Sequence, residues 1–506
     1  MHPLHCAALI LLLASAGCSR SPTNREATPR ETTPSLVSSA PSAHAARPFD
    51  PTAGAPDLRT VRVEGVPHVR QKPDFCGEAC LEMAARRLGS PLDQDDAFIL
   101  AAIDPGLGRG AFTPELVEAA KRMGFRTGPV WSQIDAHAPA VELDRLFAAM
   151  HADLVRGVPS IVCMRWSDAD QPEHFRLVVG YDAARDEIIY QEPAEDGGGG
   201  RTMSRALFLS RWPLRYGPDR WSVVRIALDP DPTGLAVRPA RAPGPSIADL
   251  SQHVQSLKER IPEGFQIRVE RPFVLIGNGG PAELEHAARD VVRFAVERLE
   301  RDFFARAPAK VLEVWLFRDA PSYQRGVRLL TGEGPGTPYG FYSPSHGMLL
   351  MNLATGGGTL VHEIVHPYVE ADLSNAPSWV NEGLGSLFEQ SADRGGHIVG
   401  LTNWRLEGLQ DAIVDRRLGS LDKLSHTTRD AFYGDGSGTH YAAARYLMFY
   451  LQERGLLVGF VKALHTDLAR DPSGWTTLVA TLGERDMAVF QKRWEAWVLE
   501  LTFPER

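Results

Sequence analysis

A proline-rich stretch near the middle of the chain constrains the fold more than any other feature. Residues Leu228 to Pro245 contain Asp-Pro-Asp-Pro and then Arg-Pro-Ala-Arg-Ala-Pro-Gly-Pro. Proline fixes φ and has no backbone N–H to donate, so such a stretch indicates a semi-rigid linker between regular regions. At 506 residues the chain is also too long for one ordinary core. We therefore expect two domains, at residues 58–228 and 247–506, separated by a linker at 229–246.

The amino terminus has the composition of an export signal. An apolar run from Ala7 to Ala14 is followed by small residues, so we expect residues 1–17 to be a cleaved signal peptide. The segment from Leu13 to Cys18 (Leu-Ala-Ser-Ala-Gly-Cys) resembles the lipid-attachment box of bacterial lipoproteins. That resemblance implies a lipid anchor on Cys18 and a place in the cell envelope. Ser19, next to the cysteine, does not resemble an inner-membrane retention signal, which favours the outer membrane. Simple cleavage, which would give a periplasmic or secreted protein, is the alternative.

Composition excludes some classes of protein. Residues 18–57 contain seven prolines and almost no large apolar side chains. Such a composition predicts a disordered tether. The rest of the chain contains no apolar run near the roughly 20 residues that a membrane helix needs. The formal net charge is -9 and the pI is near 6.0, so nothing in the electrostatics favours nucleic acid as a partner.

Apolar periodicity predicts an α+β arrangement in both domains. In the first domain it favours three helices and then three strands, at 76–88, 114–123, 142–156, 160–166, 175–181 and 187–191. In the second domain it favours strands, a long helix, another strand and a hairpin, at 266–276, 281–304, 310–317 and 340–352. Helices dominate from residue 359 onward.

The second domain carries a metal-binding pattern. In His362-Glu363-Ile364-Val365-His366 the two histidines are four residues apart, so on a helix they share one face and can reach one ion. Zinc suits two imidazoles, and a catalytic zinc takes three protein ligands plus a water. Glu363, next to the first histidine, is the expected general base. We expect one Zn²⁺ per chain.

The third ligand must come from elsewhere in the chain. Glu382 is our candidate, because Pro377 can open a second helix and the short connection lets that helix fold back beside the first. Three other acidic residues are rival candidates: Glu370, Asp372 and Glu389.

The metal pattern resembles the gluzincin superfamily of zinc metallopeptidases, in which a glutamate one helix downstream completes the ligands, often in an Asn-Glu pair such as Asn381-Glu382. The resemblance covers roughly residues 265–500. It implies a mixed sheet plus a helical lobe, and hydrolysis of peptide bonds. It also implies that the strand Met348 to Asn352 is an edge that binds extended substrate. Tyr441, which follows His440 near the start of a late helix, would support the oxyanion.

The first domain carries a cysteine pattern. The segment Gln71-Lys72-Pro73-Asp74-Phe75-Cys76-Gly77-Glu78-Ala79-Cys80 resembles papain-like cysteine peptidases, closest to the bacteriocin-processing, double-glycine leader peptidase group. A cysteine at the first turn of a helix has its thiolate favoured by the helix dipole, and Gln71 can donate to the oxyanion. The order Cys76, His174 and then Glu192 matches the family, which usually has aspartate at the last position. Glu192 or Gln191 must therefore orient His174.

The sequence thus predicts a papain-like α+β domain followed by a gluzincin-type domain, in an envelope peptidase that acts on peptide or protein substrates. One alternative is a metallopeptidase whose cysteine domain only binds peptides, and another is a non-catalytic scaffold. The cysteines have a structural alternative too: Cys76 and Cys80 could be buried apolar residues, or one of them could pair with Cys163.

Overall fold

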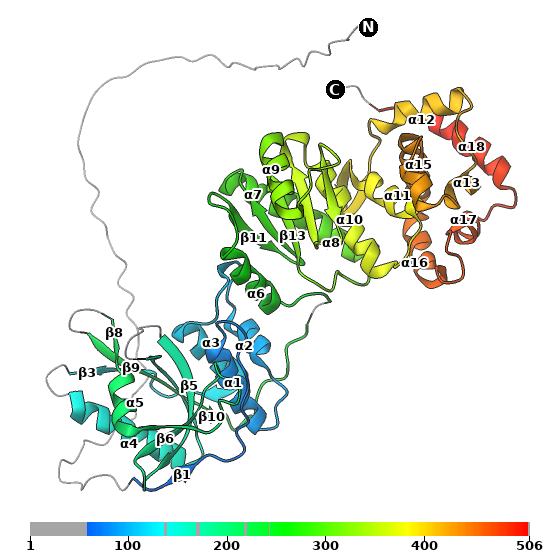
Figure 1. Cartoon of the computed structure of the whole chain (residues 1–506). Coiled ribbons are helices and arrows are strands. Elements are labelled where there is room, and N and C mark those ends of the chain that lie inside the picture. The colour runs from blue at the N-terminus through cyan, green and yellow to red at the C-terminus, as the bar shows by residue number, and fades with distance from the viewer. Residues whose placement is uncertain (1–57, 136–138, 168–172, 217–219, 242, 504–506) are drawn as a thin grey trace, which may run out of the picture. The chain divides into compact units, whose positions relative to one another are not determined.

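The computed structural model describes residues 58–135, 139–167, 173–216, 220–241 and 243–503 (Figure 1). The predicted signal peptide, the lipid site at Cys18 and the tether at 18–57 lie outside these residues. Within the described ranges, no helix is both long and apolar enough to cross a lipid bilayer. Helices and strands alternate with long-range pairing in both halves of the chain, which is the expected α+β class.

An eight-stranded antiparallel sheet organises the first part of the chain. Its strands are β3 (Trp131–Ile134), β9 (Trp221–Ala227), β4 (Ser160–Arg165), β5 (Glu173–Asp182), β6 (Glu187–Gln191) and β7 (Arg201–Ser204) in that order, with β1 (Val61–Arg62) beside β5 and β8 (Leu214–Arg215) beside β9. Successive residues of a strand face opposite sides. Ile161 and Cys163 of β4 therefore join one core, whereas Val162 and Met164 join another.

Helices cover both faces of this sheet. The core that contains Ile161 is closed by α1 (Cys76–Arg87), α2 (Gln94–Ala101) and α3 (Thr113–Met123), with a short 3-10 turn, η1 (Pro105–Leu107), between the last two. The core that contains Val162 is closed by α4 (Pro139–Val155) and α5 (Arg205–Arg211). The predicted helices and strands of this part are confirmed to within a few residues.

The predicted linker at 229–246 contacts the first part of the chain with residues 229–241, and near its end the carbonyls of Pro243 and Pro245 accept from Arg271 of the second part. Its beginning forms β10 (Asp229–Pro230), which pairs with β2 (Phe125–Arg126). Proline is tolerated there because so short an edge strand needs few backbone donors. Further on, two linker arginines form ion pairs with two acids at the start of α2: Arg238 and Arg241 with Asp93 and Asp96.

A five-stranded sheet organises the second part of the chain. Its strands are β11 (Gln266–Glu270), β12 (Phe273–Gly277), β13 (Leu312–Phe317), β15 (Met348–Asn352) and β14 (Gly340–Ser343) in that order. The three inner strands run parallel, and each outer strand is antiparallel to its neighbour.

The edge of this sheet differs from our expectation. Met348–Asn352 was predicted to be the edge strand, but it lies between β13 and β14. Its last four residues are buried, which is typical of an inner parallel strand. The edge position belongs to Gly340–Ser343, whose residues are mostly half-buried. The prediction was wrong because strand order depends on the tertiary fold and cannot be read from one apolar run.

Helices also cover both faces of the second sheet. One face carries α10 (Gly358–Asp372) and a long helix made of α7 (Pro281–His286), the π-helical stretch η2 (Ala287–Arg293) and α8 (Phe294–Asp302). The other face carries α6 (Ile247–Lys258) and α9 (Ala320–Thr331). A 3-10 turn, η3 (Leu353–Thr355), leads from β15 into α10.

The remaining residues form a helical lobe with one small hairpin. Its helices are α11 (Ser378–Phe388), α12 (Arg405–Val414), α13 (Leu421–Ser425), α14 (Arg429–Tyr433), α15 (Ser437–Glu453), α16 (Leu457–Asp467), α17 (Trp475–Leu482) and α18 (Met487–Glu500). The hairpin is formed by β16 (Ser391–Arg394) and β17 (His397–Gly400).

Candidate active sites

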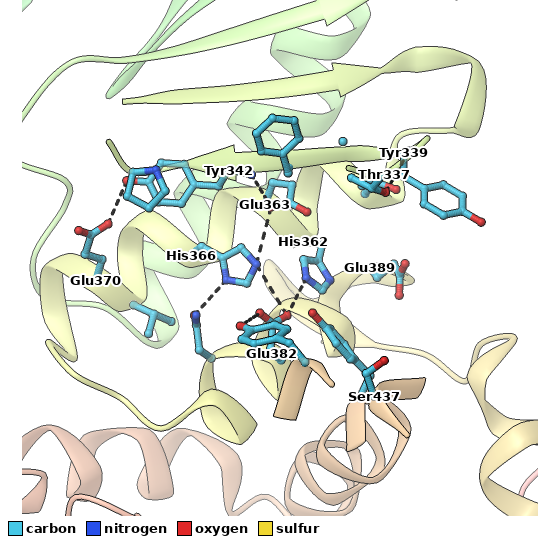
Figure 2. Close-up of a pocket in the computed structure, with 18 of the residues that line it drawn as sticks. Thr337, Tyr339, Tyr342, His362, Glu363, His366, Glu370, Glu382, Glu389 and Ser437 are labelled. Carbon is cyan, nitrogen blue, oxygen red and sulfur yellow. Dashed lines mark hydrogen bonds and ion pairs between the residues drawn. The ribbon is translucent and has the colours of Figure 1, made fainter. Parts of the chain in front are cut away.

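The predicted metal ligands come together between α10 and α11 (Figure 2). The candidate ligand atoms of His362, His366 and Glu382 all lie within 4.8 Å of one another. The Oε2 of Glu382 is 3.2 Å from the Nε2 of His362 and 3.9 Å from the Nε2 of His366. Two imidazole nitrogens and a carboxylate oxygen in one small cluster are the donors that a catalytic zinc takes.

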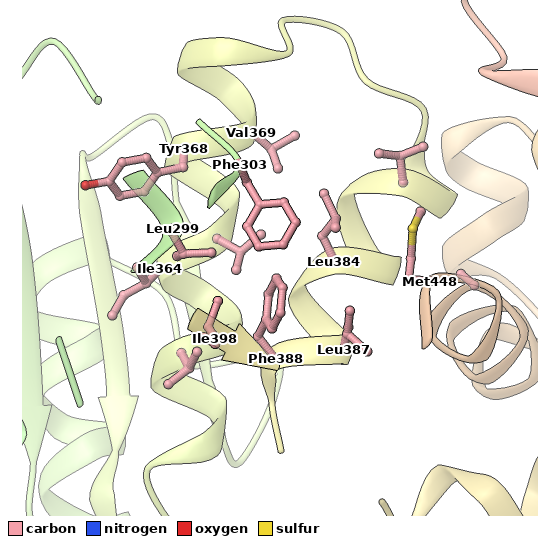
Figure 3. Close-up of a cluster of buried hydrophobic side chains, with 14 of the residues drawn as sticks. Leu299, Phe303, Ile364, Tyr368, Val369, Leu384, Leu387, Phe388, Ile398 and Met448 are labelled. Atoms are coloured by element: carbon pink, nitrogen blue, oxygen red, sulfur yellow. The ribbon is translucent and has the colours of Figure 1, made fainter. Parts of the chain in front are cut away.

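Apolar packing fixes the two helices that carry these ligands (Figure 3). On α10 the residues that face away from the cluster, such as Ile364, are buried in the same core as Leu299 of α8 and Phe303, which follows that helix. On α11, Leu384 and Phe388 belong to this core too, and the ring centroids of Phe303 and Phe388 are 5.4 Å apart. Apolar packing thus sets the positions of α10 and α11, and with them those of the three side chains.

The charges at the cluster favour a bound cation. Burial opposes ionisation of Glu382, but the charges of His366 and His362 outweigh it and hold the pKa of Glu382 at about 2. Burial lowers the pKa of His362, but its hydrogen bond to Glu382 and the nearby carboxylates, Glu363 and Glu389 among them, raise that pKa to about 9. The carboxylates around His362 thus stabilise a positive charge on it, and a metal ion would have to displace that proton because a metal-bound imidazole is neutral.

Several neighbours shape and orient the cluster. A Cβ on Gly385 would lie 3.1 Å from the Nε2 of His362, so only glycine leaves full room for that imidazole. The Nδ1 of His366 is 3.0 Å from the side-chain oxygen of Asn381, a contact that directs the opposite ring nitrogen towards the cluster. Tyr433 donates to the Oε1 of Glu382 at 2.5 Å, which leaves Oε2 facing the histidines. Burial and then the charge of Glu382 raise the pKa of Tyr433.

The predicted general base is held by the edge strand. The backbone N–H of Tyr342 in β14 donates to the Oε2 of Glu363 at 2.9 Å. Burial raises the pKa of Glu363, while His366 and His362 oppose that rise. Tyr441, predicted to support the oxyanion, lies with its ring centroid 6.4 Å from that of His362. Burial and then Glu382 raise the pKa of Tyr441, which keeps its hydroxyl protonated.

The three rival ligands have other partners. Glu370 accepts a hydrogen bond from the hydroxyl of Tyr342, and Glu389 pairs with Arg405. Asp372 pairs with Arg306. Within the described residues the metal-ligand cluster contains only the two histidines and Glu382.

A cleft of about 1150 Å³ opens over the cluster. It is bounded by β14, α10, α11 and the start of α15, and Arg429 and Tyr433 of α14 also line it. Two aromatic side chains at its wall are largely exposed, Tyr339 at 56% and Trp404 at 60%. The cleft therefore has titratable side chains at its floor and exposed aromatic side chains at its rim.

The cysteine site is assembled only in part. The Nε2 of His174, near the start of β5, is 2.6 Å from the Oε1 of Glu192, just after β6. Both side chains are buried. Gln191, the other candidate partner, bonds instead to the backbone of Val66 and Gly200. Glu192 is thus the residue that orients His174.

Cys76 begins α1 as expected, and its surroundings raise the pKa of its thiol. Burial and then Glu78 and Asp74 raise the pKa of Cys76 to about 12, although the backbone N–H groups of Phe175 and Gly77 oppose this. No hydrogen bond joins Cys76 to His174 in the part of the chain that the structure describes. This rise opposes the lowering expected from the helix dipole, while the Cys76 side chain keeps partial exposure.

The other predicted features of this site can also be placed. The backbone N–H of Gln71 bonds to the carbonyl of Pro193, and its side-chain Oε1 is buried without a hydrogen-bond partner. Cys76, Cys80 and Cys163 are all free thiols, so the disulfide alternative is not observed. Cys80 and Cys163 are core residues.

Sequence reasoning missed several residues of the two sites. The sequence motif contains Asn381 without indicating its contact with His366, and Tyr342 and Tyr433 have no local sequence signal. Arg176 donates to the Oε2 of Glu192 at 2.6 Å and is only 5% exposed. An arginine between Phe175 and Leu177, within an otherwise apolar strand, was the signal that could have identified it.

Leu384→Ala tests the packing that holds the two metal-site helices. Leu384 is fully buried, so its truncation should lower the free energy of unfolding by about 2–5 kcal/mol. Leu329 is 73% exposed, and Leu329→Ala should change the stability by no more than about 0.5 kcal/mol. Urea denaturation of both variants measures this, and equal losses would contradict the packing argument.

Glu382→Ala and Glu389→Ala separate the ligand from its nearest rival. Glu382→Ala should weaken zinc binding by more than the roughly 10–100-fold that loss of a residue behind a ligand costs. Glu389→Ala should keep zinc, because Glu389 pairs with Arg405 outside the cluster. Competition with a coloured chelator gives both affinities. Equal retention of zinc would move the third ligand elsewhere.

Two protein families match parts of the chain, and the one with a described activity matches the first half. Residues 63–218 match the model of the Peptidase_C39 like family, and residues 358–472 match a protein family of unknown function, DUF1570. No protein with a curated description matches the chain. The first match supports the papain-like prediction and a peptidase function, and the second leaves the gluzincin resemblance open.

Solved structures give likenesses over parts of the chain. The peptidase domain of Streptococcus ComA, a bi-functional ABC transporter involved in a quorum sensing pathway, is 20% identical over 32% of this chain and 98% of that domain, with a TM-score of 0.22. Native yeast LTA4 hydrolase is 12% identical over 58% of this chain, with a TM-score of 0.29, and its complex with bestatin is 13% identical over 58%, also with 0.29. The chain spans 44% and 45% of those two structures, less than half of the yeast enzyme.

Proposed function

We propose that the chain is an exported peptidase with two hydrolytic sites, a zinc site in the second part and a cysteine site in the first. The observation that carries the zinc site is the meeting of His362, His366 and Glu382 beside Glu363 at the floor of a cleft. The match to the Peptidase_C39 like family supports peptide-bond hydrolysis by the first part. The amino-terminal signal and Cys18 favour a lipoprotein at the outer membrane, with a periplasmic or secreted form as the alternative.

The residues around the proposed zinc site have different roles in hydrolysis. Zinc held by the two histidines and Glu382 would polarise the scissile carbonyl and lower the pKa of a bound water. Glu363 takes the proton of the attacking water and returns it to the leaving amine, which is general base and then general acid catalysis. The N–H of Tyr342 holds one oxygen of Glu363, so the carboxylate keeps one orientation through both transfers.

The edge strand β14 is the proposed place for the substrate backbone. Backbone groups of residues two apart face the same side of a strand. Since the N–H of Tyr342 points to Glu363 and away from β15, the N–H and C=O of Gly340 face the cleft as well. An extended peptide could pair with them as an added strand. Tyr339 and Trp404 would then contact its apolar side chains.

Two phenols are available for the oxygen that becomes negative during hydrolysis. Tyr433 donates to Glu382, and Tyr441 lies beside the same carboxylate and over His362. We propose Tyr441 as the donor to the oxyanion and Tyr433 as the residue that orients Glu382. A donor at this position stabilises charge that exists only in the transition state.

A second candidate function concerns the cysteine domain alone. The surroundings of Cys76 raise the pKa of its thiol to about 12, and no hydrogen bond joins it to His174 within the described residues. These features favour a domain that binds peptides for the zinc site without cleaving them.

Glu363→Gln tests the zinc mechanism. The substitution keeps the size of the side chain and removes its ability to take a proton, so zinc should remain bound while hydrolysis of a fluorogenic peptide library falls roughly 10²- to 10⁴-fold. Glu407, exposed on α12, provides the control, and Glu407→Gln should cleave at the rate of the unchanged protein. Undiminished turnover by Glu363→Gln would sink the assignment.

Cys76→Ala in the presence of a chelator tests the cysteine site. Chelation should remove the zinc-dependent part of the hydrolysis, and Cys76→Ala should remove what remains. Cys80, which is fully buried in the core, is the matched control, and Cys80→Ala should keep the chelator-resistant part. If chelation alone abolishes all cleavage, the first domain is a binding domain.

A further inference from the structure

A buried chain of charges runs from His174 through Glu192 to Arg176. The two oxygens of Glu192 have separate partners, because Oε1 lies 2.6 Å from the Nε2 of His174 and Oε2 accepts from the Nε of Arg176 at 2.6 Å. The backbone N–H of Ala194 also donates to Oε1 at 3.1 Å. All three charged or titratable side chains are nearly inaccessible, with His174 at 7%, Arg176 at 5% and Glu192 at 2% exposed.

Arg176 is itself fixed by its surroundings. Its guanidinium lies 5.0 Å from the ring centroid of Trp166 and 5.8 Å from that of Tyr190. The ring of Trp166 also meets His174 edge-on, with centroids 4.6 Å apart. The indole of Trp166 thus lies against both His174 and Arg176, and it limits the rotation of both side chains.

A glutamate at this position depends on a second hydrogen-bond partner more than an aspartate would. Its side chain has one more rotatable bond than aspartate, and a carboxylate with one partner can swing away from the imidazole. A second, charged partner on the other oxygen removes that freedom, and an arginine Nε–H bound to a carboxylate is among the stronger hydrogen bonds. Leaving Oε2 unpaired in so buried a position would be costly.

We propose that Arg176 is a positioning residue of the cysteine site: it clamps the second oxygen of Glu192, so that the first stays bonded to His174, and it balances the charge of Glu192. This deepens the proposed cysteine peptidase function and rests on it. The balance matters because a base must be neutral to accept the thiol proton, and a lone buried carboxylate would hold the imidazole in its protonated form. Arg176 thus keeps His174 both oriented and able to act as a base.

The pKa shifts agree in direction with this role. Burial lowers the pKa of His174, Glu192 raises it, and Arg176 lowers it again. Burial works against the ionised Glu192, but His174 and Arg176 outweigh it and lower its pKa. The titratable and charged groups that face the pair from the surrounding elements are Arg176 from β5, Tyr190 from β6, Cys80 from α1 and His68 from the segment before α1.

The test is the titration of the His174 imidazole by NMR in the whole protein, with two signals followed. In Arg176→Met the pKa of His174 should rise by about one unit or more, because the opposing positive charge is gone. The low-field proton of the His174–Glu192 hydrogen bond should broaden, because the carboxylate is no longer clamped. In Arg176→Lys the charge remains, so the pKa should change little, while the low-field proton should still broaden, since lysine lacks the fixed Nε donor.

Arg225 supplies the matched control. It pairs across β4 with the same residue, Val162, as Arg176 does, and it forms an ion pair with Asp153 away from Glu192. Arg225→Met therefore removes a comparable ion pair from the same sheet and should leave both signals unchanged. An unchanged His174 pKa in Arg176→Met, or an equal shift in Arg225→Met, overturns the proposal.

The same experiment remains decisive if a variant fails. If Arg176→Met does not fold, the low-field proton in Arg176→Lys decides, and its retention at full intensity overturns the clamp. The readout does not depend on hydrolysis. A protein that cleaves no peptide would refute the proposed function, while the His174 signals would still show whether Arg176 positions Glu192.

Discussion

The packing of α10 against α11 is the interaction on which the second half of the structure depends. His362 and His366 share a face of α10 because of their spacing, but the third ligand is useful only if α11 lies close and in register. Leu384 and Phe388 provide that contact, since both are buried in the core that α10 and α11 share. Apolar burial nearby thus offsets the cost of bringing two imidazoles and a carboxylate together.

Both sites use a buried carboxylate whose two oxygens have different partners. At the predicted metal site, Glu382 faces His362 with one oxygen and Tyr433 with the other. At the predicted cysteine site, Glu192 faces His174 and Arg176 in the same way. A carboxylate with a partner at each oxygen has little freedom to rotate. For Glu192 this keeps His174 in one orientation, whereas for Glu382 it keeps one oxygen turned towards the two histidines.

The elements and site residues that depend on short stretches of sequence could be predicted. The histidines of the metal motif, and the strands around His174, follow from periodicities of a few residues, and Glu382 follows from a short connection between two helices. The order of strands could not be predicted, because β15 is inner and β14 is the edge only through the tertiary fold. The rise in the pKa of the Cys76 thiol could not be predicted either, because a helix start favours the thiolate, whereas the burial that raises the pKa depends on the tertiary fold.

Tyr342 connects the edge strand β14 to α10 at the cleft. Its N–H holds Glu363 and its hydroxyl holds Glu370, so one residue of the edge strand is fastened to α10 at two points about two turns apart. The position of β14 and the orientation of Glu363 are therefore coupled, because a displacement of the strand would carry the Tyr342 N–H with it. A change in how the edge strand is occupied would thus reach α10 without any direct contact with that helix.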